Sequence, residues 1–215
     1  MERPVYRSLN LILLESSLIL AISCLLLAAK THSENAKNGV RSAEDARETG
    51  VAAQREGVAR EAFLAAAPVF FHPRCMNCHP SGDRPLQADD SHPHAQNVKR
   101  GRDGRGNYAL KCSNCHQLAN VPGENMPPGA PNWHLPPPTM KMVFQGKTPG
   151  GLCRQLKDPK QNGGHSVAGA IEHLRKDPLV FWGWNPGDGR TLPPLSHAEF
   201  VRKMDEWLKN GAACP

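Results

Sequence analysis

Two short segments share the pattern Cys-x-x-Cys-His, and this repeat constrains the chain more than any other feature. The segments are residues 75–79 (Cys-Met-Asn-Cys-His) and residues 112–116 (Cys-Ser-Asn-Cys-His). Two cysteines three positions apart project from one tight turn, so both sulfurs can add to the two vinyl groups of one haem. The histidine that follows then lies under the iron. The pattern predicts two covalent c-type haems on Cys75, Cys78, Cys112 and Cys115, with His79 and His116 as axial iron ligands.

A four-cysteine zinc site is the main alternative, because zinc ribbons also combine two C-x-x-C pairs. The stretch between Cys78 and Cys112 is longer than the usual ribbon spacing, and a zinc site does not need a histidine after each pair. A disulfide within each pair would also leave the histidines unexplained. The sequence therefore favours haem as the cofactor.

The chain is rich in residues that interrupt regular secondary structure. It contains 20 prolines and 19 glycines among 215 residues, and only 6% of its residues are aromatic. This composition argues against a large layered core. A small loop-rich domain usually needs a covalent cross-link or a bound metal to be stable. Two haems would add buried apolar surface that the side chains do not provide.

Helical patterns occur in a few segments near the C-terminus. Thr148-Pro149 is typical of a helix start, and residues 166–176 predict a short helix. The clearest helix covers residues 196–210, where Ser196 and Glu199 match a capping box. The apolar residues of this segment recur on one helical face: Phe200, Val201, Met204, Trp207 and Leu208.

The other segments of this region are predicted loops. Residues 80–107 and 120–140 lack helical periodicity, and the prolines of the second segment exclude a long helix there. No stretch shows a convincing alternation of apolar and polar residues. We therefore predict a mainly α, loop-rich fold, a dihaem cytochrome c-like domain with little or no sheet.

Three parts are predicted along the chain. Residues 1–29 are largely apolar after two arginines, which predicts a signal peptide, or an uncleaved membrane anchor in which Glu15 would be costly. Residues 30–67 predict a charged, solvated linker or helix that ends at Pro68. Residues 68–215 form the predicted dihaem domain. Export predicts a periplasmic location, with membrane contact only if the first segment is retained.

The cysteines outside the two motifs predict a disulfide. Of the seven cysteines, Cys24 lies in the apolar leader and four belong to the motifs. Cys153 and Cys214 remain as an even pair in an oxidising compartment. Two separate free thiols are the alternative.

The far side of each iron is less constrained by the sequence. A histidine there lowers the reduction potential, whereas a methionine raises it. Met126 precedes a proline, a step that resembles the ligand loop of single-haem cytochromes c, and other candidates lie in loops near a motif or in a short apolar helix. The candidate sixth ligands are His94, Met126, His134 and His173. The histidines predicted to be exposed or capping are His92, His165 and His197.

The spacing of the motifs predicts that both haems share one fold. Cys75 and Cys112 are too close in sequence for two tandem single-haem domains. The two haems must therefore lie close together, where they can pass electrons across the protein.

The net charge of +6 raises the question of a nucleic-acid partner. The chain has no stacked aromatics among its basic residues and no nucleic-acid motif, so we expect none. Haem propionates would offset much of the positive charge. The basic residues between the motifs either pair with propionates or form a docking patch for an acidic redox partner: Lys99, Arg100, Arg102 and Arg105.

The chain resembles small exported dihaem c-type cytochromes over about residues 62–215. The resemblance rests on residues 71–80, 111–117, 129–134 and 182–187, which include both motifs. Some proteins of this kind are described as isoquinoline 1-oxidoreductase subunits or occur beside molybdenum hydroxylases. The resemblance implies redox partner proteins: a periplasmic molybdenum-containing dehydrogenase that donates electrons, and a downstream cytochrome or oxidase.

Together these features predict an electron-transfer protein rather than an enzyme. The alternative is a dihaem enzyme, of the peroxidase or sulfur-compound oxidase type, with one open haem iron. Such an enzyme needs nearby acid–base groups, and the sequence offers no convincing set beyond Glu124 and Glu172. A redox or gas sensor is a third class, disfavoured because no signalling domain is attached.

Overall fold

The computed structural model describes residues 30, 32, 39, 41 and 44–215. The chain divides into two units, residues 1–53 and residues 54–215. In the first unit, residues 44–53 are helical and exposed. The predicted signal peptide or anchor, residues 1–29, lies outside the described residues. Within the part that the structure describes, no helix is both long enough and apolar enough to cross a membrane.

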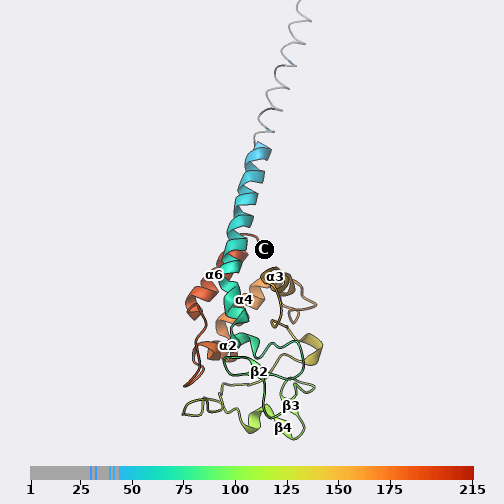
Figure 1. Cartoon of the computed structure of the whole chain (residues 1–215). Helices are drawn as coiled ribbons and strands as arrows, with labels where there is room; N and C mark the ends of the chain where they lie inside the picture. The colour runs from blue at the N-terminus through green and yellow to red at the C-terminus, as the bar shows by residue number, and fades with distance from the viewer. Residues whose placement is uncertain (1–29, 31, 33–38, 40, 42–43) are drawn as a thin grey trace, which may run out of the picture. The chain divides into compact units, whose positions relative to one another are not determined.

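The second unit is mainly helical with very little sheet, as predicted (Figure 1). It begins with a helix over residues 54–71. The later α-helices are α2 (Pro73–Met76), α3 (Pro149–Lys157), α4 (Val167–Lys176), α5 (Pro178–Phe181) and α6 (His197–Lys209). Turns of 3₁₀ helix are η1 (Cys112–Asn114), η2 (Pro138–Met140) and η3 (Trp182–Trp184). Two antiparallel hairpins pair β1 (Leu86–Gln87) with β2 (His92–Pro93), and β3 (Gly106–Asn107) with β4 (Leu110–Lys111).

The predicted helix starts near the C-terminus are confirmed. The hydroxyl of Thr148 accepts a hydrogen bond from the amide of Gly151 at the start of α3, and Ser166 caps α4 in the same way. Ser196 and Glu199 form both bonds of the capping box of α6. These side chains satisfy amide groups that have no partner within the helix.

The helix over residues 54–71 belongs to the hydrophobic core, which corrects the prediction of a solvated segment ending at Pro68. Phe63 and Phe70 are fully buried. The ring centroid of Phe63 lies 5.1 Å from that of Trp207, and the centroid of Phe70 lies 5.1 Å from that of Phe200. The prediction failed because alanines separate the large apolar residues, so the buried face carries a weak hydrophobic signal.

Pro68 lies inside this helix instead of ending it. A proline in a helix removes the hydrogen bond to the carbonyl four residues earlier, here that of Leu64. Both Pro68 and Leu64 are exposed. The free carbonyl is therefore on the side of the helix that meets water, where solvent can satisfy it.

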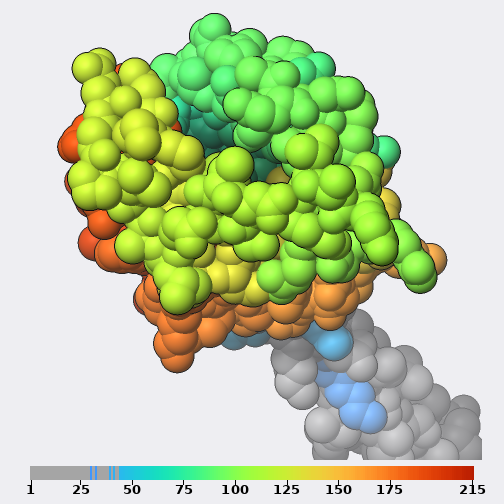
Figure 2. Space-filling view, turned by 90° about the horizontal axis from the view of Figure 1, so that it is seen from below, coloured from blue at the N-terminus to red at the C-terminus, as the bar shows by residue number. Residues whose placement is uncertain are grey.

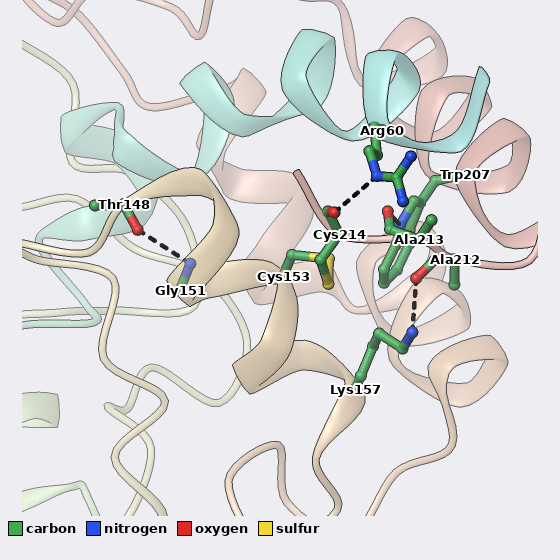
Figure 3. Close-up of a disulfide and its surroundings, with 9 residues drawn as sticks. All are labelled: Arg60, Thr148, Gly151, Cys153, Lys157, Trp207, Ala212, Ala213 and Cys214. Atoms are coloured by element: carbon green, nitrogen blue, oxygen red, sulfur yellow. Dashed lines mark hydrogen bonds between the residues drawn. A yellow bond between two sulfur atoms is a disulfide. The ribbon is translucent and has the colours of Figure 1, made fainter. Parts of the chain in front are cut away.

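The predicted disulfide between Cys153 and Cys214 is confirmed (Figure 3). It joins α3 to the C-terminal segment, and side chains from three helices add hydrogen bonds to that segment. Arg60 donates to the carbonyl of Cys214 at 3.2 Å, and Lys157 donates to the carbonyl of Ala212 at 2.8 Å. The indole of Trp207 donates to the carbonyl of Ala213 at 3.0 Å. The C-terminal segment is therefore tied to three helices.

The predicted loop regions lie at the end of the unit away from α3 and α6 (Figure 1). Their two hairpins are only two residues per strand, so other contacts must hold these loops. The side chain of Arg100, which is 1% exposed, donates to the carbonyls of Gly82 and Pro136. Gly104, at φ +79°, packs so closely on the carbonyl of Leu135 that a Cβ atom would clash with it.

Removing the disulfide should destabilise the second unit. The bond spans 61 residues, and in the chain-entropy model a closed loop of this size contributes about 4 kcal/mol. We expect Cys153→Ser with Cys214→Ser to lower the free energy of unfolding by about that amount in denaturant titrations. Peptide mapping of the unreduced protein should recover the two cysteines in one crosslinked pair, and two alkylatable thiols there would contradict the assignment.

Truncation of Phe63 tests whether residues 54–71 are part of the core. Phe63→Ala removes a fully buried ring and should cost about 3–5 kcal/mol of unfolding free energy. The neighbouring Leu64 is 46% exposed, so Leu64→Ala is a matched control with a small expected effect. Equal losses in thermal or denaturant unfolding for both variants would show that this helix does not pack as described.

Candidate functional site

The first Cys-x-x-Cys-His segment forms a compact turn at α2. Pro73 occupies the first helical position, where its missing amide costs nothing, and Cys75 lies within the helix. The amide of Cys78 then donates to the carbonyl of Cys75 at 3.2 Å. This single turn brings both sulfurs to the same side of the chain and presents His79 next to them.

A loop more than sixty residues later in the chain holds the ring of His79. Its Nδ1 atom lies 2.7 Å from the carbonyl oxygen of Met142, and its ring stacks on Phe144 with a centroid distance of 3.9 Å. A carbonyl can only accept, so Nδ1 carries the proton and Nε2 keeps its lone pair. This is the tautomer that can coordinate a metal ion through Nε2, and the carbonyl also makes that nitrogen a better ligand.

The second segment repeats this arrangement with different residues. The amides of Cys115 and His116 both donate to the carbonyl of Cys112, which closes the turn at η1. The Nδ1 atom of His116 lies 2.7 Å from the carbonyl oxygen of Pro128, and its ring stacks on Trp133 with a centroid distance of 4.4 Å. Each histidine thus has one backbone carbonyl at Nδ1 and one aromatic ring against its face.

Burial shifts the pKa values of several motif side chains in the direction that favours their neutral forms. Desolvation lowers the pKa of His79 to about 4, although its bond to Met142 acts in the opposite direction. Burial also lowers the pKa of His116. Desolvation raises the pKa of Cys75 to about 12 and that of Cys78 to about 11. The histidines are therefore neutral at physiological pH, the state in which they bind metals.

Each motif opens into its own cavity. The first cavity, of about 270 Å³, is lined by Cys75, Cys78 and His79 and extends to apolar residues of the core such as Phe70 and Leu156. The second cavity, of about 490 Å³, contains the other motif: Cys112, Cys115 and His116. Figure 2 shows a hollow in the loop end of the molecule, bounded by the segments that surround this second motif. Both cavities are mainly apolar, as cofactor sites usually are.

The two cavities share a wall. Arg74, Cys78 and Trp182 line both of them. The indole of Trp182 is fixed by a 2.8 Å hydrogen bond to Asn120, and it contacts Trp133 edge to face at a centroid distance of 4.9 Å. Groups held in the two cavities would therefore be separated by only a few side chains.

The predicted sixth ligands are distributed unequally between the cavities. His94 lines the second cavity, and its ring centroid lies 6.3 Å from that of His116. His134 and His173 both line the first cavity. Met126 lines neither cavity; it is 42% exposed, and its carbonyl accepts a bond from Arg190.

The separation of His94 and His116 suits two imidazoles on opposite sides of one metal ion. With metal–nitrogen bonds of about 2 Å on each side and the ring radii added, the centroids would be about 6 Å apart. The Nδ1 atom of His94 is buried without a hydrogen-bond partner. Its backbone is fixed nevertheless, because its amide donates to Pro85 and its carbonyl accepts from Arg84.

Sequence reasoning missed several residues of the site. His165, predicted to be exposed or capping, also lines the first cavity, and its ring lies 6.2 Å from that of His173. Phe144 and the carbonyl of Met142 carry no sequence signal that connects them to a motif more than sixty residues earlier. Trp133 lies in residues 129–134, one of the segments on which the resemblance to dihaem cytochromes rests, but the sequence does not predict that it stacks on His116.

The basic residues between the motifs do not act as one group. Arg100 is buried and donates to backbone carbonyls, and its guanidinium lies 3.5 Å from Asp83. Arg105 donates to the side chain of Asn132. Lys99 and Arg102 are exposed. Arg100 therefore has a structural role, whereas the other three remain accessible to a partner.

The positions of the four motif cysteines do not match a zinc cluster. None of the four is in a disulfide, and among the described residues no three His, Cys, Asp or Glu side chains are grouped closely enough to hold one metal ion. Comparisons of the chain with protein-family models, characterised proteins and solved structures found no match.

Proposed function

We propose that this protein carries two covalently attached c-type haems and transfers electrons between partner proteins in the periplasm. One observation carries the proposal: the two Cys-x-x-Cys-His turns place their histidines in the same environment. In each turn, Nδ1 of the histidine is hydrogen-bonded to a backbone carbonyl, and the ring stacks on an aromatic side chain. Each histidine also lies beside its own cavity. Such a repeat of motif and environment is typical of axial haem ligation.

The residues present fit such a group. The sulfurs of each pair lie on one turn beside an apolar cavity, which suits attachment to the edge of a flat macrocycle. Buried polar atoms without protein partners lie in the same region, namely Arg74 Nε and His94 Nδ1. When bound, each haem supplies a one-electron redox couple.

The chain's own residues set the coordination. His79 and His116 would each hold the iron of one haem, because Phe144 and Trp133 fix their ring planes. We assign His94 as the ligand on the far side for the second cavity, and His134 or His173 for the first. His134 fits this role because its Nδ1 lies 2.5 Å from the carbonyl of Asn132, which leaves Nε2 free.

The proposed reaction moves electrons only. A reduced donor loses one electron per haem and becomes oxidised, the chain holds that electron, and an oxidised acceptor receives it; no bond forms or breaks. The proposed donor is a periplasmic molybdenum-containing dehydrogenase, and the proposed acceptor is a downstream cytochrome or oxidase. Two histidine ligands for each haem would suit this role, because they would leave no position at the iron for a substrate.

The enzyme alternative requires an open iron position and an acid–base group beside it. Neither Glu124 nor Glu172 lines a cavity. Glu172 instead pairs with Arg175 at 3.1 Å and with Lys176 at 2.5 Å on the surface of α4. Neither glutamate is therefore placed to supply that acid–base group.

Haem attachment is tested by intact mass. Exported protein should exceed its polypeptide mass by two haems and keep them in denaturant. Cys75→Ala with Cys78→Ala should remove one haem, and Cys112→Ala with Cys115→Ala the other. Replacing the disulfide pair, Cys153 and Cys214, with serine is the matched control and should keep both. A mass with zinc and no haem would refute the proposal.

The assignment of His94 is tested by the ligand-binding spectrum. His94→Ala should leave one iron per chain without its sixth ligand, so one haem should become high-spin and bind carbon monoxide when reduced. His92, two residues earlier and exposed, is the control, because its ring bonds Asp90 at 2.6 Å outside both cavities. An unchanged His94→Ala spectrum would contradict the assignment. Carbon monoxide binding and peroxide consumption by the unmodified protein would favour the enzyme instead.

A further inference from the structure

Arg74 occupies a special position between the two cavities. It directly precedes Cys75 in α2, and its side chain is only 2% exposed. It lines both cavities, together with Cys78 and Trp182. Of the described arginines that line the two motif cavities, Arg74 lines both, whereas Arg190 lines the second alone.

The hydrogen bonds of Arg74 leave part of its guanidinium unsatisfied. One terminal nitrogen donates to Asp89, while Nε is buried and has no partner in the protein. The carboxylate of Asp89 is partly exposed and also accepts from the amide of Thr191 at 3.0 Å, so its charge is shared with water and backbone. Arginine stays protonated in proteins, so Arg74 keeps a buried positive charge and a free donor beside both cavities.

We propose that Arg74 is a shared electrostatic residue of both haem sites, whose free N–H donates to an anionic haem substituent and whose charge raises the reduction potential of both irons. The inference rests on the proposed function. A fixed cation favours the state with one more electron, and its effect is large where burial lowers the effective dielectric constant. Because the same charge faces both cavities, the two potentials should respond together.

The test is a spectroscopic redox titration of the full-length protein with its haems attached. Arg74→Gln should lower both reduction potentials. We expect each reduction equilibrium constant to fall about tenfold, which corresponds to about 59 mV for a one-electron couple. Arg74→Lys keeps the charge and should restore most of the shift. Arg190→Gln is the matched control and should lower one potential only, because Arg190 lines the second cavity alone.

A second variant covers the case in which Arg74→Gln does not fold. Asp89→Asn removes the countercharge of Arg74, so it should raise both potentials, the opposite sign to Arg74→Gln. If both haems are retained and Asp89→Asn or Arg74→Gln moves only one potential or none, the role of Arg74 is wrong while the proposed function stands. If the unmodified protein carries no haem, the proposed function itself fails.

Discussion

The hydrogen bond from each motif histidine to a backbone carbonyl is the constraint on which the rest of the site depends. A Cys-x-x-Cys-His turn is local, but the carbonyl that fixes its histidine comes from elsewhere: Met142 for His79 and Pro128 for His116. The loops that carry these carbonyls must be held in place without a sheet or long helices. Proline restricts their backbone, and buried side chains such as Arg100 tie one loop to the next through carbonyl groups. Rigidity in this region therefore comes from side chain–backbone bonds rather than from regular secondary structure.

The helical half of the unit provides the hydrophobic core. Its core of large apolar residues lies between residues 54–71 and α6, and the disulfide ties α3 to the C-terminal segment beside it. The two halves meet at Phe70 and Phe144, whose rings contact edge to face at a centroid distance of 5.3 Å. Phe144 also stacks on His79. The orientation of the first histidine is thus linked directly to the packing of the hydrophobic core, whereas the second depends on Trp133 and the loops.

Local signals in the sequence predicted the parts of the structure that local chemistry determines. The capping box at Ser196, the helix starts and the pairing of the two cysteines outside the motifs all depend on residue types at short spacing or on a count, and all are confirmed. The helix over residues 54–71 was misjudged because an alanine-rich pattern does not distinguish a solvated face from one packed against large aromatic residues. The partners of the histidines could not be predicted, because a backbone carbonyl has no residue type and Phe144 is distant in sequence. The methionine before a proline is a local pattern as well, but Met126 lines neither cavity.

The short interval between the motifs has a physical consequence for function. Because the two turns are close in sequence, their cavities share the side chains of Arg74, Cys78 and Trp182. Two redox groups separated by one layer of side chains do not have independent energies, since a charge gained by one changes the potential felt by the other. A buried cation in that layer, partly neutralised by Asp89, would offset the repulsion between two added electrons. Under the proposed function, these shared side chains would both separate the two haems and favour the reduction of both.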